Sequence, residues 1–411
     1  MYGYRSTWAT CGKPQASRRR RFDAFFPRFK SVGNGGAVPF SRLIYETSDF
    51  LNNFDGVRAQ TQKQAASARA VAEQVLLHEG FPQPSIDVLH LVQRGECDVY
   101  RARAGSHELV LHTGPEQVVE QLHDNLVTLE QIEGEGVPRV IGWTAPPDCE
   151  HGPAVLITSL IAGLELSGRT FKREAWADLC DLLLRLHRLP ADAEPSGRRR
   201  PVHDAASFPA LAAQLEEAVQ RHRLPIRLDR LRGHLSAMAE YARLHAAAFN
   251  VRPKLIHTDL SRANVLIDGP KAGIVDWLDL GPGDYAFDLA SLKFAMDSVR
   301  PGDSAKLLKE QASLYRALFD DSTLELRMRF FLALVGLVRA HSYAHHARPY
   351  PPGRAWRVRT CYLHSEAQWR SPLRLEGPEV GAPAVMTDHR PLPPTPPLRA
   401  LFYLASNRRS I

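Results

Sequence analysis

The stretch LIHTDLSRANVLIDGPKAGIVDWLDLGPGDYAFDLA, residues 255–290, carries the motifs around which the rest of the chain is organised. It begins with the pattern H-x-D-x4-N, formed by His257, Asp259 and Asn264. Two apolar, β-branched runs follow, NVLI and AGIV, with DGPK between them. DGPK is typical of a turn, so these runs predict a β-hairpin.

The hairpin explains how oxygen ligands distant in sequence can meet. Asn264 and Asp276 lie on either side of Pro270 at equal separation, so a turn centred near Pro270 brings both to the open end of the hairpin. Phosphoryl transfer needs a carboxylate to accept or orient the proton of the attacking hydroxyl, which suits Asp259. It also needs hard oxygen ligands for Mg²⁺, which suits the amide and the second carboxylate.

The combined motifs resemble the aminoglycoside phosphotransferase and choline kinase-like family of small-molecule kinases, which are relatives of the protein kinases. The family pattern places a metal-binding Asp before a Trp, here Asp276 and Trp277, and a D-x-A-x-D-L-A-like segment later, here with Asp284 and Asp288. The resemblance spans roughly residues 80–345. It implies an α+β, bilobal protein-kinase-like fold with a small β-rich first lobe and a larger, mainly helical second lobe.

The resemblance also implies roles for three further residues. His257 supports the catalytic loop, and Asp288 braces that loop from the next helix. Asp279 occupies a position where family members use an acid for cationic substrates, although a solvated surface acid explains it equally well. The implied reaction is ATP- and Mg²⁺-dependent phosphorylation of a hydroxyl on a small molecule. Aminoglycoside, choline, homoserine, macrolide and amino-sugar kinases share these motifs, so the substrate stays open.

The first lobe is expected at residues 61–160, with a helix near 62–77, several strands and an amphipathic helix at 116–133. The strand–turn–strand around Gly95 resembles the loop that covers nucleotide phosphates, although an ordinary β-turn explains a lone glycine as well. AVLITSLIAG resembles the strand and hinge whose backbone contacts adenine. The residues expected to bind ATP are Gly95, Asp98, Val110, His112, Asn125, Thr158 and Leu160.

The usual Lys–Glu pair of the first lobe is absent. Alignment of LVLH with the V-A-I-K pattern places His112 where the Lys should be, and the Glu position on the following helix falls on Asn125. At about 100° per residue, Asn125 lies on the apolar side of its helix. The two residues predict a neutral pair. A catalytically impaired pseudokinase that binds nucleotide or a protein partner is therefore the alternative function.

The second lobe is expected at residues 161–370. The apolar run from Phe330 to Val338 is too short to span a bilayer and predicts a buried helix. Two basic ends flank the lobes, an extension at 1–60 and a Pro-rich tail at 371–411, and an interaction protein working through these ends is a further alternative. Helices are expected near residues 176–189, 208–222, 227–248, 303–319 and 324–345, with a last one reaching about 369.

Charge and cysteine content bound the partners and the compartment. The formal net charge is +7, but residues 61–370 carry 37 basic against 38 acidic residues. The core therefore predicts neither a nucleic-acid partner nor a membrane partner. The five cysteines show no metal-binding spacing and suit a reducing cytoplasm, where we expect the protein. The sequence does not indicate an oligomeric state.

Overall fold

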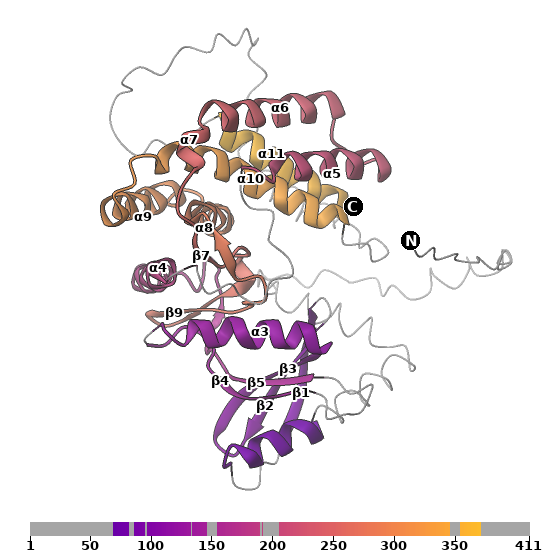
Figure 1. Cartoon of the computed structure of the whole chain (residues 1–411), viewed down its shortest axis with the longest axis vertical. Coiled ribbons are helices and arrows are strands. Elements are labelled where there is room, and N and C mark those ends of the chain that lie inside the picture. The colour runs from indigo at the N-terminus through magenta and orange to yellow at the C-terminus, as the bar shows by residue number, and fades with distance from the viewer. Residues whose placement is uncertain are drawn as a thin grey trace, which may run out of the picture. The chain divides into compact units, whose positions relative to one another are not determined.

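The computed structural model describes eight segments of the chain (Figure 1). The predicted N-terminal extension, the predicted Pro-rich tail and Gly95 lie outside them. The described segments are residues 69–81, 86–94, 97–132, 134–145, 154–189, 191, 205–345 and 354–370.

A five-stranded antiparallel sheet forms the first layer, in the order β1-β2-β3-β5-β4. The β-branched and aromatic runs of the sequence become strands, as predicted. Consecutive strands pair through short connections, except that β5 inserts between β3 and β4. The strands are β1 (Ile86–Arg94), β2 (Cys97–Ala104), β3 (His107–Gly114), β4 (Val140–Thr144) and β5 (Ala154–Ser159).

The two faces of this sheet carry different helices because successive side chains of a strand point to opposite faces. Leu156 packs in an apolar cluster with α3 (Glu116–Leu129), the predicted amphipathic helix. Ile157, its neighbour on β5, packs instead with Leu76 from the helix at residues 69–78. Figure 1 shows the sheet between these two helices. The sheet is therefore covered on both faces.

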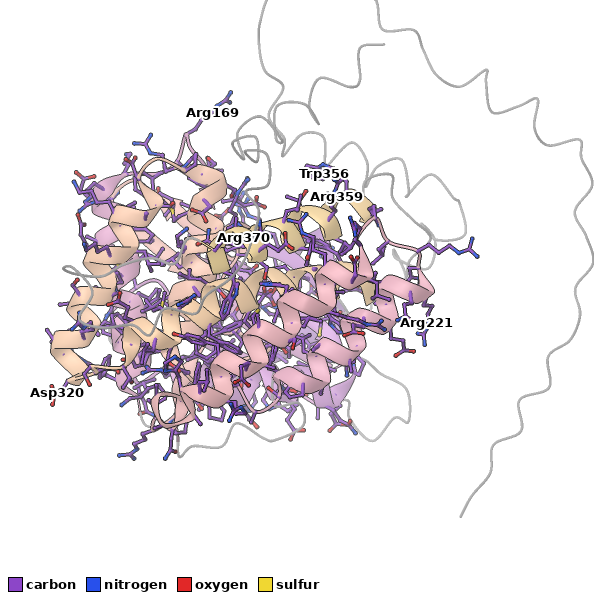
Figure 2. All side chains as sticks on the ribbon, turned by 90° about the horizontal axis from the view of Figure 1, so that it is seen from above. Arg169, Arg221, Asp320, Trp356, Arg359 and Arg370 are labelled. Atoms are coloured by element: carbon purple, nitrogen blue, oxygen red, sulfur yellow. The ribbon has the colours of Figure 1, made fainter. Side chains whose placement is uncertain are left out.

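Helices dominate the chain after the sheet, and most of them lie where the sequence predicted a helix. Charged side chains of these helices reach outward, as Figure 2 shows for Arg221 at the end of the helix that begins at Phe208. The helices are α4 (Arg173–Arg188), α5 (Phe208–Arg221), α6 (Leu228–Leu244), α7 (Ala246–Phe249), α8 (Tyr285–Val299), α9 (Ser304–Phe319), α10 (Leu324–His345) and α11 (Arg354–Arg370).

Helix α10 is the centre of the largest apolar cluster, which also takes in side chains of α5, α6, α8 and α11. The apolar run from Phe330 to Val338 is almost wholly buried there, which confirms the predicted buried helix. Full burial suits a helix that is apolar all round. Among the described residues, none of the helices combines the length and the hydropathy needed to cross a membrane.

Two small antiparallel sheets connect the helices to the catalytic stretch. One has the order β6-β8-β9 and the other pairs β10 with β7. The predicted hairpin is formed by β8 and β9, with Val265 opposite Ile274. The elements are β6 (Leu164–Glu165), β7 (Lys254–Ile256), the 3₁₀ turn η2 (Arg262–Asn264), β8 (Val265–Asp268), β9 (Lys271–Ile274) and β10 (Gly281–Gly283).

The loop after α3 crosses this hairpin at close range. Gly136 has a φ of +106°, and a Cβ there would lie 2.9 Å from the carbonyl oxygen of Ala272. Only glycine adopts that conformation and allows that approach without strain. The carbonyl of Gly136 accepts a hydrogen bond from the N–H of Ile274 at 2.8 Å. The hairpin is thereby tied to the segment that leads into β4.

Candidate active site

A buried carboxylate fixes the backbone of the loop that follows β7. Asp288 of α8 accepts hydrogen bonds from the N–H groups of His257 (2.7 Å) and Thr258 (3.0 Å). Thr258 has a φ of +69°, a conformation that needs such support in a residue other than glycine. Burial alone would raise the pKa of Asp288, but hydrogen bonds from His187 and from the loop hold that pKa below its usual value. The ionised carboxylate therefore braces the loop.

His257 links this loop to the end of the hairpin. Its Nδ1 accepts a hydrogen bond from the N–H of Asp259 at 3.2 Å. Nε2 is then the protonated nitrogen and donates to the carbonyl of Val275 at 3.1 Å. The ring also packs on Trp277, with ring centroids 4.6 Å apart, and is fully buried. His257 thus positions Asp259 and the residue before Asp276 without facing solvent.

Asp259, Asn264 and Asp276 come together at the open end of the hairpin. The Nδ2 group of Asn264 donates to the carbonyl of Asp259 at 2.9 Å and to its Oδ2 at 3.2 Å. The N–H of Val275 donates to the carbonyl of Asn264 at 2.9 Å, directly before Asp276. Because Nδ2 faces Asp259, the amide Oδ1 is the Asn264 atom suited to a cation. An amide oxygen and a carboxylate fit Mg²⁺ that also binds phosphate and water.

Arg339 is a site residue that the sequence analysis missed. It lies on α10, and its Nη1 donates to Oδ1 of Asp259 while Nη2 donates to the carbonyl of Leu260 at 3.3 Å. The sequence offered one signal, a charged residue that ends the apolar run Phe330–Val338. Nothing in that local pattern shows which loop the arginine reaches.

Three of the residues expected to bind ATP share one face of the large sheet. Val110 lies opposite Thr158, and His112 lies opposite Leu156, so all four side chains point to the face that α3 covers. Thr158 Oγ1 is 3.4 Å from His112 Nε2. Val110 and His112 are partly exposed, and so remain accessible to a ligand.

Asp98 is not brought to that face. It lies opposite Thr113, and its charge acts on Tyr100, whose pKa burial raises to about 12 with a further contribution from Asp98. Side chains two residues apart on a strand share a face, so Asp98 lies with Tyr100 on the side of the helix at 69–78. Val99, opposite His112, takes the place expected for Asp98 and was missed.

Asn125 is buried, as its helical position predicted, but it does not pair with His112. Its Nδ2 donates to the carbonyls of Trp277 (2.8 Å) and Leu278 (3.0 Å), next to a bond from Gln121 to the Leu278 carbonyl. On α3 the side chain of Asn125 faces the segment after Asp276 and not His112. The expected pair of His112 and Asn125 is therefore wrong. Within the described part of the chain, Asn125 Oδ1 is buried without a hydrogen-bond partner.

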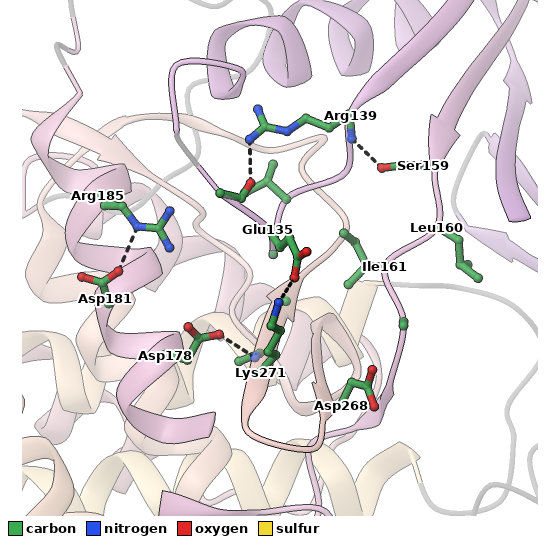
Figure 3. A pocket seen from close by; sticks show the side chains of 16 residues that line it. Glu135, Arg139, Ser159, Leu160, Ile161, Asp178, Asp181, Arg185, Asp268 and Lys271 are labelled. Carbon is green, nitrogen blue, oxygen red and sulfur yellow. Dashed lines mark hydrogen bonds and ion pairs between the residues drawn. The ribbon is translucent and has the colours of Figure 1, made fainter. Parts of the chain in front are cut away.

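One cavity is lined by residues outside the catalytic loop (Figure 3). It encloses about 1140 Å³ and is lined by Leu160 and its neighbours, the loop after α3, one side of α4 and the hairpin turn. The catalytic-loop and metal-site candidates do not line it. Two ion pairs lie among its charged side chains, Lys271 with Glu135 and Arg185 with Asp181. Asp178 accepts a hydrogen bond from the N–H of Ala272 at 2.8 Å, and Asp268 is exposed at the hairpin turn.

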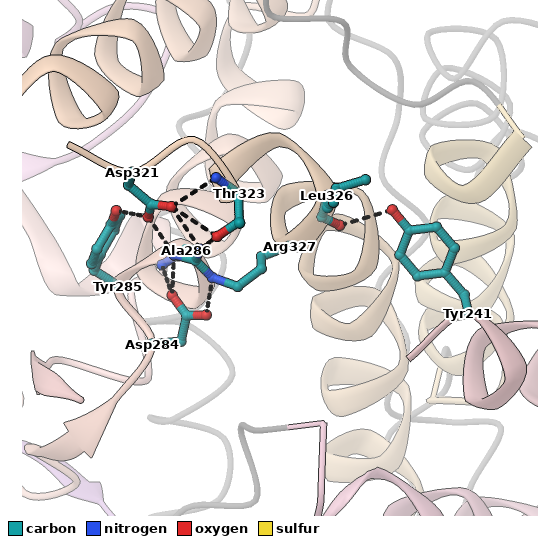
Figure 4. Close-up of polar contacts among 8 residues, drawn as sticks. All are labelled: Tyr241, Asp284, Tyr285, Ala286, Asp321, Thr323, Leu326 and Arg327. Atoms are coloured by element: carbon teal, nitrogen blue, oxygen red, sulfur yellow. Dashed lines mark hydrogen bonds and ion pairs between the residues drawn. The ribbon is translucent and has the colours of Figure 1, made fainter. Parts of the chain in front are cut away.

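The remaining acids of the stretch have different surroundings. Asp279 is exposed, and its backbone carbonyl accepts a hydrogen bond from the Thr258 hydroxyl at 3.1 Å. Asp284 caps α8 by accepting from the N–H of Ala286 at 2.9 Å. It also accepts from Arg327, which is buried against Asp284 in the network of Figure 4. Asp284 is therefore a structural residue.

A family model for the phosphotransferase enzyme family matches residues 93–331. No curated protein matches the chain at a significant level. The matched range begins at the end of β1 and ends within α10, so it takes in the other four strands of the sheet, the hairpin and the loop that carries Asp259.

Solved structures of kinases share the fold. One is a thermostable mutant of aminoglycoside phosphotransferase APH(4)-Ia in ternary complex with AMP-PNP and hygromycin B, with TM-score 0.52, 15% identity, and coverage of 73% of this chain and 98% of that chain. Another is choline kinase from Cryptosporidium parvum, with TM-score 0.51, 11% identity, and coverage of 70% and 89%. At these identities the likeness concerns the fold, and it confirms the predicted kinase-like class with a small antiparallel sheet and a helical C-terminal part.

Proposed function

The chain belongs to the phosphotransferase enzyme family, and we propose that it transfers the γ-phosphate of ATP to a hydroxyl group of a small molecule in the presence of Mg²⁺. The meeting of Asp259, Asn264 and Asp276 at one end of the β8–β9 hairpin carries this proposal. The nucleotide complex of the structurally similar APH(4)-Ia mutant supports ATP as the donor. Residues 61–160 and 161–370 are the proposed limits of the two lobes.

In the proposed reaction, Asp259 accepts the proton of the acceptor hydroxyl. The acceptor oxygen forms a bond to the γ-phosphorus, the bond between that phosphorus and the β,γ-bridging oxygen breaks, and ADP leaves. Asn264 and Asp276 would hold Mg²⁺, which would supply positive charge to neutralise the phosphates. His257 and Asp288 act indirectly, because they fix the loop backbone that carries Asp259.

The adenine and phosphates would lie against the α3-covered face of the large sheet. Val99, Val110 and His112 present their side chains there, with Thr158 beside them on β5. His112 is proposed to contact phosphate in place of the usual lysine. Asn125 is proposed to act from α3, because its amide holds the backbone directly after Asp276.

The test compares Asp259→Asn with Asp268→Asn, which removes an exposed carboxylate from the same hairpin. Labelled ATP and a panel of small hydroxyl compounds report turnover, and calorimetry reports binding of Mg²⁺ and ATP. We expect Asp259→Asn to bind ATP normally and to lose roughly 10²-fold or more in kcat, since a general base contributes about 10²–10⁴-fold. We expect Asp268→Asn to match the parent protein.

Two results would contradict the proposal. Equal turnover by Asp259→Asn and the parent would remove Asp259 from the reaction. Binding of ATP by the parent without transfer to any acceptor or to water would favour the pseudokinase alternative instead.

A further inference from the structure

Arg339 occupies the place where an acceptor hydroxyl would approach the proposed base. Its Nη1 donates to Asp259 Oδ1, while Oδ2 of the same carboxylate accepts from Asn264. The side chains of Arg339 and Asp259 are 21% and 38% exposed, so a ligand can reach both. The guanidinium is thus held beside the reacting position and open to solvent.

Stability does not account for this contact. A partly exposed ion pair contributes little because water screens the charges and the long side chains lose freedom. Another arginine already anchors α10. Arg327 is fully buried and bonds to both Asp284 and Asp321. The position of Arg339 therefore calls for a role in ligand binding.

The segment of sequence that carries Arg339 is basic. Residues 328–365 contain six arginines and no aspartate or glutamate. Tyr343 lies one helical turn beyond Arg339 on α10, and the guanidinium of Arg357 from α11 lies 5.6 Å from its ring centroid. Burial raises the pKa of Cys361 to about 12, and Arg339 and Arg357 both act against that rise, so both cations lie near this cysteine. Two guanidinium groups therefore share one side of the α10–α11 pair.

We propose that the acceptor of this enzyme is an anionic hydroxyl compound whose carboxylate or phosphate group is bound by Arg339 while its hydroxyl reaches Asp259. This inference rests on the proposed function, because it takes Asp259 as the base. A guanidinium presents several N–H donors in a planar fork that matches the two oxygens of a carboxylate or phosphate. An ammonium-bearing acceptor would instead meet the like charge of Arg339 beside the base. When the anionic group of the acceptor binds Arg339, the N–H group that now donates to Asp259 Oδ1 donates to the acceptor instead. Asp259 Oδ1 can then accept a hydrogen bond from the acceptor hydroxyl.

The first test measures anion binding without any turnover. The full chain is first saturated with Mg²⁺ and AMP-PNP, so that the protein groups that bind the phosphates of the nucleotide are occupied. Citrate is then titrated by calorimetry at constant ionic strength. We expect Arg339→Gln to weaken citrate binding roughly tenfold or more, because charge-assisted hydrogen bonds are lost. Arg359→Gln is the matched control, since Arg359 is exposed and points outward from α11 (Figure 2). We expect it to change binding less than about twofold.

The second test compares acceptors of one skeleton that differ in charge: gluconate, glucose and glucosamine. We expect kcat/KM to fall in that order, and Arg339→Gln to raise the KM for gluconate while leaving that for glucose nearly unchanged. An equal loss for all three acceptors and for ATP hydrolysis without acceptor would place Arg339 on the γ-phosphate and overturn the proposal. So would citrate binding that survives in Arg339→Gln, or a preference for glucosamine.

The two proposals fail separately. If the parent neither binds nor hydrolyses ATP, the proposed function is wrong whatever citrate does. If ATP is hydrolysed but citrate and gluconate fail to bind or to react better than the neutral and cationic probes, only the anionic-acceptor proposal is wrong.

Discussion

Two arginines of helix α10 bind carboxylates in opposite surroundings. Arg327 is fully buried and donates to Asp284 and Asp321 through all three of its guanidinium nitrogens, at 2.6–3.2 Å (Figure 4). Arg339 is partly exposed and reaches Asp259 and one backbone carbonyl. The first arginine joins the start of α8 to α10, whereas the second lies at the proposed reacting group.

The difference in burial separates an arginine with a structural role from one that we propose binds a ligand. In a dry site a charge must be satisfied completely, because an uncompensated buried ion is costly. At a wet site an incomplete set of bonds is tolerated and leaves donors for a ligand. The same residue type on one helix therefore serves two purposes, and the degree of burial distinguishes them.

The largest expected effect on stability comes from replacing each of the two arginines in turn. We expect Arg327→Ala to lower the free energy of unfolding by about 3–5 kcal/mol, because the buried Asp284 and the partly buried Asp321 lose their counter-charge. Arg339→Ala should lower it by less than about 1 kcal/mol. Urea unfolding of the full chain measures both. Equal losses would mean that burial does not decide the role of these arginines.

Two buried histidines near α11 make the free energy of unfolding depend on pH. Burial lowers the pKa of His234 and of His364 to about 4 from the usual 6.5. The unfolded chain then binds more protons than the folded one between these values. Stability is complete above about pH 6.5 and declines as the pH falls toward 4, by up to about 1.4 kcal/mol per pH unit for each histidine.

Thermal unfolding between pH 7.5 and 4.5 checks this expectation. His234→Gln can keep a hydrogen bond to Ser365, which His234 Nε2 now contacts at 2.8 Å, and should flatten the decline. His78→Gln is the control, because the side chain of His78 is 88% exposed. A decline that persists unchanged in His234→Gln would show that this histidine does not titrate on unfolding.

The proposed metal site offers a smaller effect that separates shared from independent ligands. Asn264→Ala and Asp276→Ala should each weaken Mg²⁺-dependent ATP binding. Together they should cost less than their sum, with a coupling free energy of about 0.5–3 kcal/mol, if they hold one ion. Calorimetry with and without Mg²⁺ measures the cycle. Additive losses would mean that the two side chains do not share a cation.

Local pattern predicted the hairpin and the helices because apolar periodicity and turn residues act over a few positions. It also predicted that Asn125 is buried, because helical geometry alone places that side chain. Its partners were missed, since the carbonyls of Trp277 and Leu278 come from a segment more than 150 residues away. Arg339 was missed for the same reason, as the docking of α10 decides which loop it reaches.

The face of Asp98 was missed for a different reason. The pairing of Asp98 with Thr113 is a register property, and one residue of shift between β2 and β3 reverses every side chain. Asp98 and His112 were both expected to bind ATP, but the sheet puts their side chains on opposite faces. The phosphate-loop resemblance does not show which face of the sheet the side chain of Asp98 takes.

The smallest expected effect concerns Asn125, which is fully buried like Arg327 but has one unsatisfied oxygen. Asn125→Ala removes two hydrogen bonds and also removes the penalty of that oxygen. The net loss of stability should therefore be about 1 kcal/mol or less, well below that of Arg327→Ala.

Gln121→Ala, which loses a single partly buried bond to Leu278, is the matched control. Urea unfolding compares the two, and ATP titration of both variants follows whether the backbone after Asp276 keeps its position. A loss above about 3 kcal/mol for Asn125→Ala would mean that the oxygen is satisfied in solution, and that burial with incomplete bonding is not what distinguishes this residue from Arg327.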